Sequence, residues 1–190
     1  VQTAPATKVA LGEEFGMEPG EIVEGKQVAA LKALGFNAVL DTCFSADLTI
    51  MEEAAEVLHR VVSGKEPLPQ FTSCCPGWVK FCEYYYPEMF DHLSTCKSPQ
   101  QMFGAVAKTY YAKKLGLEPG KIVSVEIRPC TGKKYGAATP EMNAAGREYG
   151  EDSVRGVDIG LTTRELAQLL KKNRLDLNGL TDERYDSILG

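Results

Sequence analysis

Two adjacent cysteines, Cys74 and Cys75, lie at a sharp change in sequence pattern and could bind a metal. The apolar segment 67–71 before them predicts a short buried strand, and residues 79–86 after them have the spacing of an amphipathic helix. Pro76 fits the first position of that helix, which places Cys75 at or near the N-cap. Free backbone N–H groups and the helix dipole stabilise a thiolate there, and the thiolate is the form that binds metal.

A second corner of the same kind surrounds Cys130. It follows the apolar segment 121–127, which predicts a strand, and continues with Thr131-Gly132-Lys133-Lys134. One cysteine corner alone is more often a packing detail than a site. In open α/β sheets, however, ligands gather at the carboxyl ends of strands. We therefore expect Cys75 and Cys130 to converge on one pocket.

The spacing of these thiols indicates what they could bind. None of them belongs to a Cys-x-x-Cys pair, which disfavours zinc-ribbon and thioredoxin-like sites. Unpaired thiolates from separate turns suit an iron–sulfur cluster bound across a fold. The other cysteines, Cys43, Cys82 and Cys96, are interpreted as small buried hydrophobic residues.

Charged side chains share one face of the helix predicted over residues 47–62. Glu53, Glu56 and Arg60 are spaced i, i+3 and i+7, so they form one stripe. The stripe is either a solvated face with a Glu56–Arg60 ion pair or, if it lies against the thiol corner, a carboxylate relay for protons. Periodicity leaves both interpretations open. The stripe expected to face inward is apolar and consists of Leu48, Met51, Ala55, Leu58 and Val62.

Three other polar residues have an ordinary interpretation from the pattern alone. Ser94 is interpreted as a turn hydroxyl and Gln100 as part of a helix-capping sequence. Lys133 is either a surface lysine or, if the Cys130 turn is buried beside a metal site, a cation that holds an anionic ligand.

Length and composition exclude several classes of protein. With 190 residues and 44% hydrophobic content, the chain can build one good core or two small lobes. Its net charge of −5 without a basic cluster disfavours nucleic acid, and no apolar run approaches the roughly 20 residues that span a membrane. Reduced thiols and a cytoplasmic location are expected, and the start at Val1 indicates a piece of a longer protein.

Strand and helix patterns alternate along the chain. Short apolar runs bounded by turn residues predict strands, and 3.6-residue periodicity between capping residues predicts helices. The alternation implies an α/β fold with parallel sheets flanked by helices. Further predicted strands cover residues 36–41 and 157–161, and the predicted helices include 24–34, 47–62, 98–115 and 162–172.

With these motifs, the chain resembles the catalytic H-cluster domain of the iron–iron (FeFe) hydrogenases nearly from end to end. The motifs around the cysteines, at residues 72–78 and 129–134, are highly specific for that family. Further similarity lies in residues 4–5, 11–16, 46–53, 97–101 and 161–166. The resemblance implies an enzyme that reversibly reduces protons to dihydrogen with electrons from ferredoxin or a similar carrier.

The resemblance also implies a cofactor and its ligands. The H-cluster of the family is a 4Fe–4S cubane joined to a two-iron subsite with carbonyl, cyanide and a bridging dithiolate amine. Cys75 and Cys130 match cubane ligands, and Cys74 matches the thiol that exchanges protons with the amine. Lys133 matches the lysine that hydrogen-bonds a cyanide.

Other residues match the proton path and the surroundings of the two-iron unit. Glu53, Ser94 and Glu56 match the outward relay, and Arg60 matches a basic residue near its outer end. The positions that match cofactor-binding residues around the two-iron unit are Ala4, Pro5, Gln100 and Pro129.

The family fold has two lobes, each a small parallel sheet flanked by helices, with the cluster between them. We expect residues 1–116 to form the first lobe and residues 117–190 to form part of the second. The chain ends before the motif that supplies the other two cubane cysteines. The H-cluster is therefore expected in an intact parent and absent from this fragment alone, and the remainder of the catalytic domain or a second subunit is an expected partner.

Two residues depart from the family pattern: Arg128, where methionine is usual, and Gly136, where glutamate is usual. One alternative is a hydrogen-sensing relative, for which Arg128 leaves room. Another is an iron–sulfur assembly relative, a class that does not keep the Cys74-Cys75 pair. A metal-free interaction module with a degenerate site is an alternative from a different class.

Overall fold

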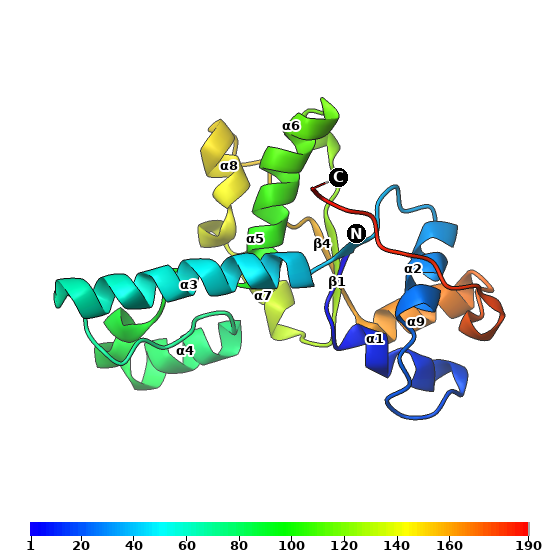
Figure 1. Ribbon diagram of the computed structural model, residues 1–190, viewed down its shortest axis with the longest axis horizontal. Coiled ribbons are helices and arrows are strands. Elements are labelled where there is room, and N and C mark those ends of the chain that lie inside the picture. Colours follow the sequence, from blue (N-terminus) through cyan, green and yellow to red (C-terminus); the bar gives the residue numbers. More distant parts are fainter. Residues whose placement is uncertain (190) are drawn as a thin grey trace.

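A four-stranded parallel sheet lies at the centre of the computed structural model, which describes residues 1–189 (Figure 1). The strand order is β2-β1-β3-β4, and all three pairs of neighbours are parallel. The strands are β1 (Gln2–Thr3), β2 (Leu40–Asp41), β3 (Val125–Arg128) and β4 (Ile159–Thr162). The predicted α/β fold with a parallel sheet is confirmed.

Helices connect and cover these strands, and local sequence sets their ends. The Thr162 side chain accepts a hydrogen bond from the Glu165 N–H in a full capping box, and the Ser98 side chain caps the helix that follows it. Each predicted helix is present, although a π-helical turn at Ala107–Tyr111 interrupts the one over 98–115. The α-helices are α1 (Thr7–Ala10), α2 (Glu24–Ala33), α3 (Cys43–Ser63), α4 (Pro76–Tyr85), α5 (Pro99–Val106), α6 (Ala112–Leu115), α7 (Gly132–Ala138), α8 (Ala144–Tyr149) and α9 (Thr163–Lys172).

The sheet separates two apolar clusters. Successive side chains of a strand point to opposite faces, so Ile127 packs with Leu31 of α2 and Leu170 of α9 in the larger cluster. On the other face, Leu40 packs with Phe103 of α5. Figure 1 shows the same arrangement, with α2 and α9 grouped on one side of the sheet and α5 and α6 on the other.

The sheet takes strands from both sides of the lobe boundary expected near residue 116. β1 and β2 precede that residue, β3 and β4 follow it, and β1 pairs directly with β3. A boundary there does not separate two sheets, because parallel strands joined by crossovers bring distant segments side by side. The strand expected over residues 67–71 is reduced to one parallel bridge between Phe71 and Leu93.

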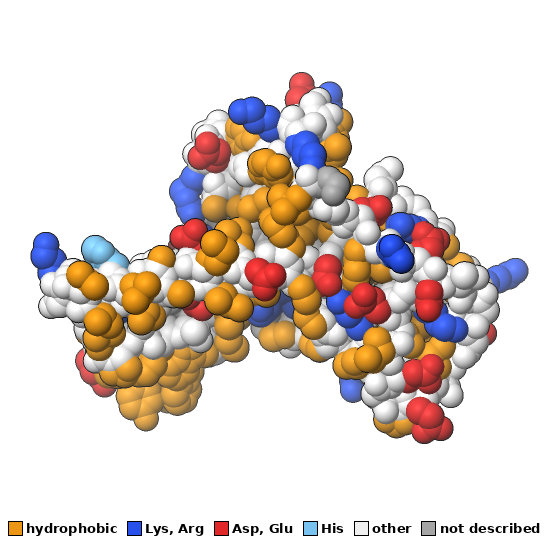
Figure 2. All heavy atoms as spheres, in the orientation of Figure 1, with side chains coloured by type: hydrophobic (Ala, Val, Ile, Leu, Met, Phe, Trp, Pro, Cys, Tyr) orange, Lys and Arg blue, Asp and Glu red, His pale blue; other side chains and the backbone are white. Residues whose placement is uncertain are grey.

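The inward face predicted for α3 is wrong. Met51, Leu58 and Val62 are 69%, 64% and 85% exposed, whereas Thr49 and Arg60 are buried. The polar face packs inward because its groups find hydrogen-bond partners there, and the apolar face is bare (Figure 2). Despite the length of α3, no helix among residues 1–189 is apolar enough over a sufficient length to cross a bilayer.

Candidate active site

The helical side of the first cysteine corner is built as the sequence predicts. Cys75 is the N-cap of α4 with extended backbone angles (φ −99°, ψ 113°), and Pro76 begins the helix. Cys75 is exposed and Cys74 is half-buried beside it. A Cβ on Gly77 would lie in ordinary van der Waals contact with the Cys75 sulfur, at 3.7 Å.

The second corner lies at the carboxyl end of β3. Cys130 is half-buried between β3 and α7, and a Cβ on Gly132 would also lie in ordinary contact with the cysteine sulfur, at 3.7 Å. α7 packs against α4, and a Cβ on Gly136 would lie only 3.1 Å from Cγ of Pro76. The Cys130 corner follows β3 of the sheet, and the packing of α7 against α4 brings the Cys75 corner beside it.

Lys133 lies among the thiols of both corners. Burial lowers the pKa of its ammonium and the nearby Arg128 lowers it further, whereas Cys74, Cys130 and Cys75 act to raise it. The three sulfurs therefore lie within electrostatic range of one ammonium. A partly desolvated cation at this place is suited to hold an anionic ligand.

A cavity of about 510 Å³ lies between α4, α5 and α7. Cys74, Gln100 and Lys133 line it, and Gly136 contributes no side chain to fill it. Cys74 also borders a more open depression shared with Cys75, so its thiol stands between the two spaces. A mostly apolar cavity with a few convergent polar groups is the usual form of a cofactor site.

The polar stripe of α3 faces the loop that carries Ser94. The buried Ser94 hydroxyl donates to Oε2 of Glu56 at 2.6 Å, and the Thr95 N–H donates to Oε1 of Glu56 at 3.1 Å. Arg60 Nη2 donates to the same Oε1 at 2.8 Å. Burial alone would raise the pKa of Glu56, but the hydrogen bonds from Ser94, Arg60 and Thr95 outweigh it and lower the pKa.

Glu53 lies one turn away from Glu56 on α3, and its pKa is shifted in the opposite direction. Its buried Oε1 has no hydrogen-bond partner among residues 1–189. Burial raises its pKa, the nearby Ser94 hydroxyl opposes this, and the charge of Glu56 raises the pKa further. Ser94 therefore lies between a carboxyl group that favours its protonated form and one that favours its ionised form. A hydroxyl in that position can accept a proton on one side and release one on the other.

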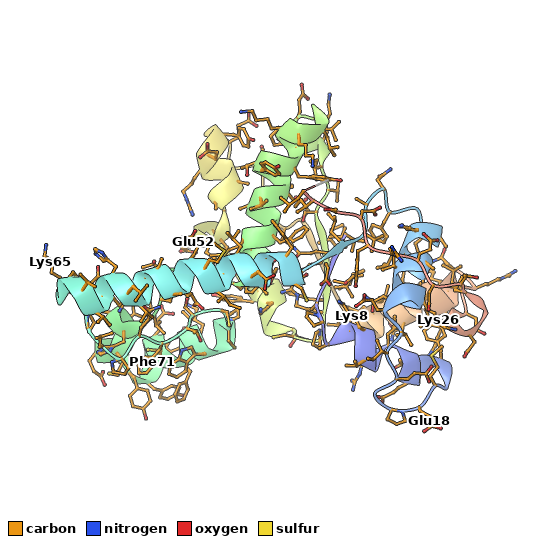
Figure 3. The ribbon with its side chains drawn as sticks, viewed as in Figure 1. Lys8, Glu18, Lys26, Glu52, Lys65 and Phe71 are labelled. Carbon is orange, nitrogen blue, oxygen red and sulfur yellow. The ribbon has the colours of Figure 1, made fainter. Side chains whose placement is uncertain are left out.

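The Ser94 loop is tied to the first cysteine corner. Ser73, next to Cys74, donates to the backbone carbonyls of Ser94 at 2.7 Å and Cys96 at 2.8 Å. The Ser94 N–H in turn donates to the carbonyl of Phe71 at 2.7 Å. Figure 3 shows Phe71 on the segment that runs beneath α3. The relay residues and the thiol corner thus belong to one hydrogen-bonded unit.

Arg60 anchors the outer end of the stripe. Its guanidinium is buried and donates to the carbonyls of Pro67 (3.2 Å), Asp91 (3.0 Å) and Leu93 (2.9 Å) as well as to Glu56. Of the two interpretations left open above, a solvated ion pair does not describe this stripe.

The remaining predicted positions lie at the same edge of the sheet. The Ala4 N–H donates to the carbonyl of Ile127 at 2.9 Å, which brings Ala4-Pro5 beside the segment that leaves β3 toward Pro129. Pro5 and Pro129 are exposed, Ala4 is half-buried, and Gln100 is buried at the start of α5.

One polar group near the site was not predicted from the sequence. Glu126 and Arg128 form an ion pair at 0% and 5% exposure, and Arg128 Nη1 also donates to Oε1 of Gln100. Burial lowers the pKa of Arg128 to about 9, which is still above neutral pH, so the guanidinium keeps its charge. The available signal was a pair of opposite charges two residues apart in an otherwise apolar strand, where side chains share a face.

The thiols present fit one half of a four-cysteine cluster site. Cys75 and Cys130 offer two thiolates, whereas an all-cysteine 4Fe–4S site takes four. Within residues 1–189, no group of three or more His, Cys, Asp or Glu side chains is arranged to hold a single metal ion.

Cys82 is buried as expected, but Cys43 and Cys96 are only half-buried, so their interpretation as buried hydrophobic residues is wrong.

Sequence comparison identifies the family. The model described as "Iron only hydrogenase large subunit, C-terminal domain" matches residues 1–190. The chain belongs to this family. It is 53% identical over 197 residues to the NADP-reducing hydrogenase subunit HndD of Solidesulfovibrio fructosivorans, covering 100% of this chain and 32% of that protein. It is 48% identical over 188 residues to the periplasmic [Fe] hydrogenase large subunit of Nitratidesulfovibrio vulgaris, covering 98% of this chain and 43% of that protein.

Solved structures of the iron-only hydrogenase family share the fold. The chain superposes on apo [FeFe]-hydrogenase HydA1 of Chlamydomonas reinhardtii with a TM-score of 0.90 and 41% identity, covering 100% of this chain and 46% of that one. The chain thus spans less than half the length of these relatives.

Proposed function

We propose that this chain is part of the catalytic domain of an iron–iron hydrogenase, whose complete form reversibly reduces protons to dihydrogen with electrons from ferredoxin or a similar carrier. The observation that carries the proposal is the meeting of the Cys75 and Cys130 corners beside a cavity lined by Cys74 and Lys133. Cys75 and Cys130 would each give a thiolate to the cubane of the H-cluster, which supplies the redox chemistry when bound.

Cys74 holds a proton at the wall of the cofactor cavity. A weakly acidic thiol beside a basic group exchanges a proton with little change in free energy in either direction, and reversible catalysis requires that balance. Lys133 holds an anionic ligand in the same cavity by its charge, while Ala4, Pro5, Gln100 and Pro129 shape the surroundings.

Protons travel between Cys74 and solvent along α3. Glu53, whose pKa is raised by burial, passes a proton to the Ser94 hydroxyl, and Glu56 receives it at the outer end. Glu56 and Ser94 border a cavity of about 970 Å³ that is open on one side, which supports an exit to solvent there.

The rest of the catalytic domain, or a second subunit, is the proposed structural partner. It would supply the other two cubane thiolates and cover the bare apolar face of α3. This face consists of Ile50, Met51, Val57, Leu58, Val61 and Val62. We propose a cytoplasmic location and no nucleic-acid or membrane partner.

Anaerobic reconstitution tests this function. The chain is incubated with iron and sulfide alone and with the remainder of its catalytic domain, and bound iron, bound sulfide and hydrogen evolution are measured. We expect a stoichiometric cubane, and activity after the two-iron subsite is added, only with the remainder present. Cys75→Ser and Cys130→Ser should each lose the cubane, whereas Cys43→Ser is the matched control. An active cluster on the chain alone, or no cubane in the completed domain, contradicts the proposal.

A second candidate is a hydrogen-sensing relative, for which the buried Arg128 in place of the usual methionine leaves room. A sensor would show a hydrogen-dependent spectral change with very slow turnover, whereas the proposed enzyme sustains hydrogen evolution. The rate measured in the reconstituted domain separates the two.

A further inference from the structure

We propose that Arg128 is a positioning residue that locks the side-chain amide of Gln100 as a hydrogen-bond donor toward the cofactor cavity. The inference rests on the proposed function and concerns Arg128, one of the two residues in which this chain departs from the family pattern.

The Arg128 side chain is itself held by its strand. Glu126 and Arg128 stand two residues apart on β3, so both point to the face that α5 covers, where they form their buried ion pair. Glu126 is in register with Gly160 of β4, and a Cβ on Gly160 would lie 2.7 Å from Oε1 of Glu126. Gly160 thus leaves the space that the Glu126 carboxylate needs, and the carboxylate in turn fixes the guanidinium.

The chemistry of a guanidinium then dictates how Gln100 is oriented. Arginine carries five N–H donors and no acceptor, so it can bind a glutamine amide only through the amide oxygen. Arg128 Nη1 donates to Oε1 of Gln100 in this way. The other end of the amide, Nε2, must therefore point away from Arg128. It is buried and has no hydrogen-bond partner within the described part of the chain.

The free donor end belongs to a residue of the cavity wall. Gln100 is 3% exposed and lines the 510 Å³ cavity together with Cys74 and Lys133. A buried donor without a partner is costly, so a ligand that brings an acceptor atom to it is favoured. A methionine at position 128 has no donor and only a weakly accepting sulfur, so it could not fix Gln100 through the amide oxygen as Arg128 does. The Glu126–Arg128 pair therefore selects a cavity ligand with an acceptor edge toward α5, such as a cyanide or carbonyl group on the two-iron subsite.

Infrared spectroscopy of the loaded, complete enzyme tests this inference, because the stretching bands of carbonyl and cyanide ligands respond to hydrogen bonds. We expect Arg128→Met and Gln100→Ala to shift the same band in the same direction. In the Gln100→Ala background, Arg128→Met should cause no further shift. The inference is overturned if Arg128→Met leaves the bands unmoved. It is also overturned if Arg128→Met shifts them equally with and without the Gln100→Ala substitution.

A second variant guards against misfolding, because Arg128→Met alone leaves Glu126 charged and unpaired in the core. Arg128→Met combined with Glu126→Ser removes both charges and should reproduce the band shift; a folded double variant with unshifted bands overturns the inference. The two proposals fail differently. An unmodified enzyme that binds no cluster defeats the proposed function, whereas a loaded enzyme whose bands ignore Arg128 defeats only the role of this residue.

Discussion

The α2–α9 side of the sheet and the arm formed by α3 and α4 bury opposite kinds of side chain. Beside the sheet, Leu31 and Leu170 are fully buried in a continuous apolar cluster. On α3, Arg60 is buried and its Nη atoms donate to backbone carbonyls, while Leu58 and Val62 are exposed. The first region is a closed apolar core. The second region buries its polar relay and exposes its apolar face. Periodicity therefore identifies a helix, but which face is covered depends on the neighbours that the helix has.

The largest expected effect is the loss of turnover in Cys74→Ala of the complete enzyme, since this thiol is proposed as the proton carrier at the cavity. The rate of hydrogen evolution should fall by about 10²–10⁴-fold, while the iron content stays unchanged. Cys43→Ala, on the same arm but away from the cavity, should leave the rate near normal. Loss of the cubane in Cys74→Ala would mean that Cys74 is a ligand.

Glu53→Gln should also slow the complete enzyme, by about 10²-fold, because an amide cannot relay a proton as a carboxyl group does. The matched control is Glu52→Gln, since Glu52 is exposed on the neighbouring face of α3. Equal rates in the two variants would show that the polar face of α3 has a structural role and does not transfer protons.

Stability distinguishes the two regions directly. Leu170→Ala in the closed apolar core should lower the free energy of unfolding of the 190-residue chain by about 2–5 kcal/mol. Leu58→Ala on the bare face should change it by less than about 0.5 kcal/mol. Denaturant unfolding measures both, and a similar loss in both variants would mean that the back of α3 is already covered in this chain.

The smallest effects concern pH and distinguish the two carboxyl groups of the relay. The lowered pKa of Glu56 means that its contribution to stability is present above its ordinary value of 4.5 and is lost as pH falls below it. Glu56→Gln should therefore lower the melting temperature at pH 7 and have little effect near pH 3. The raised pKa of Glu53 has the opposite sign, since its burial costs stability as pH rises and the group ionises.

Glu53→Gln should accordingly raise the melting temperature at pH 7. Thermal melts of both variants across the pH range provide the measurement. Shifts of the same sign at pH 7 would contradict the proposed division between a protonated inner group and an ionised outer one.

Features that depend on local sequence were predictable. The Thr162–Glu165 capping box, the Ser98 cap and Pro76 after Cys75 each set a helix start within a few residues, and all three are observed. β1 was not predictable, because a strand of two residues is held by its neighbours rather than by its own pattern. The inward face of α3 was predicted wrongly for the related reason that burial is a tertiary property.

The candidate site also has features that the sequence could predict and features that it could not. The meeting of the Cys75 and Cys130 corners was expected from the rule that parallel strands end at one edge of a sheet. The strand expected before Cys75 is only a bridge outside the sheet, however, and the packing of α7 against α4 brings the two corners together. The contact of Arg128 with Gln100 could not be derived, because it joins residues 28 positions apart and depends on strand register and on the space over Gly160.

The central claim is that the Cys75 and Cys130 sulfurs face one shared space that holds an iron–sulfur cluster. X-ray diffraction from the loaded, complete enzyme at the iron absorption edge tests this most directly. We expect one compact group of anomalous iron peaks within bonding distance of both the Cys75 and the Cys130 sulfur. Iron bound to only one of them, or the two sulfurs on opposite sides of the molecule, would contradict it.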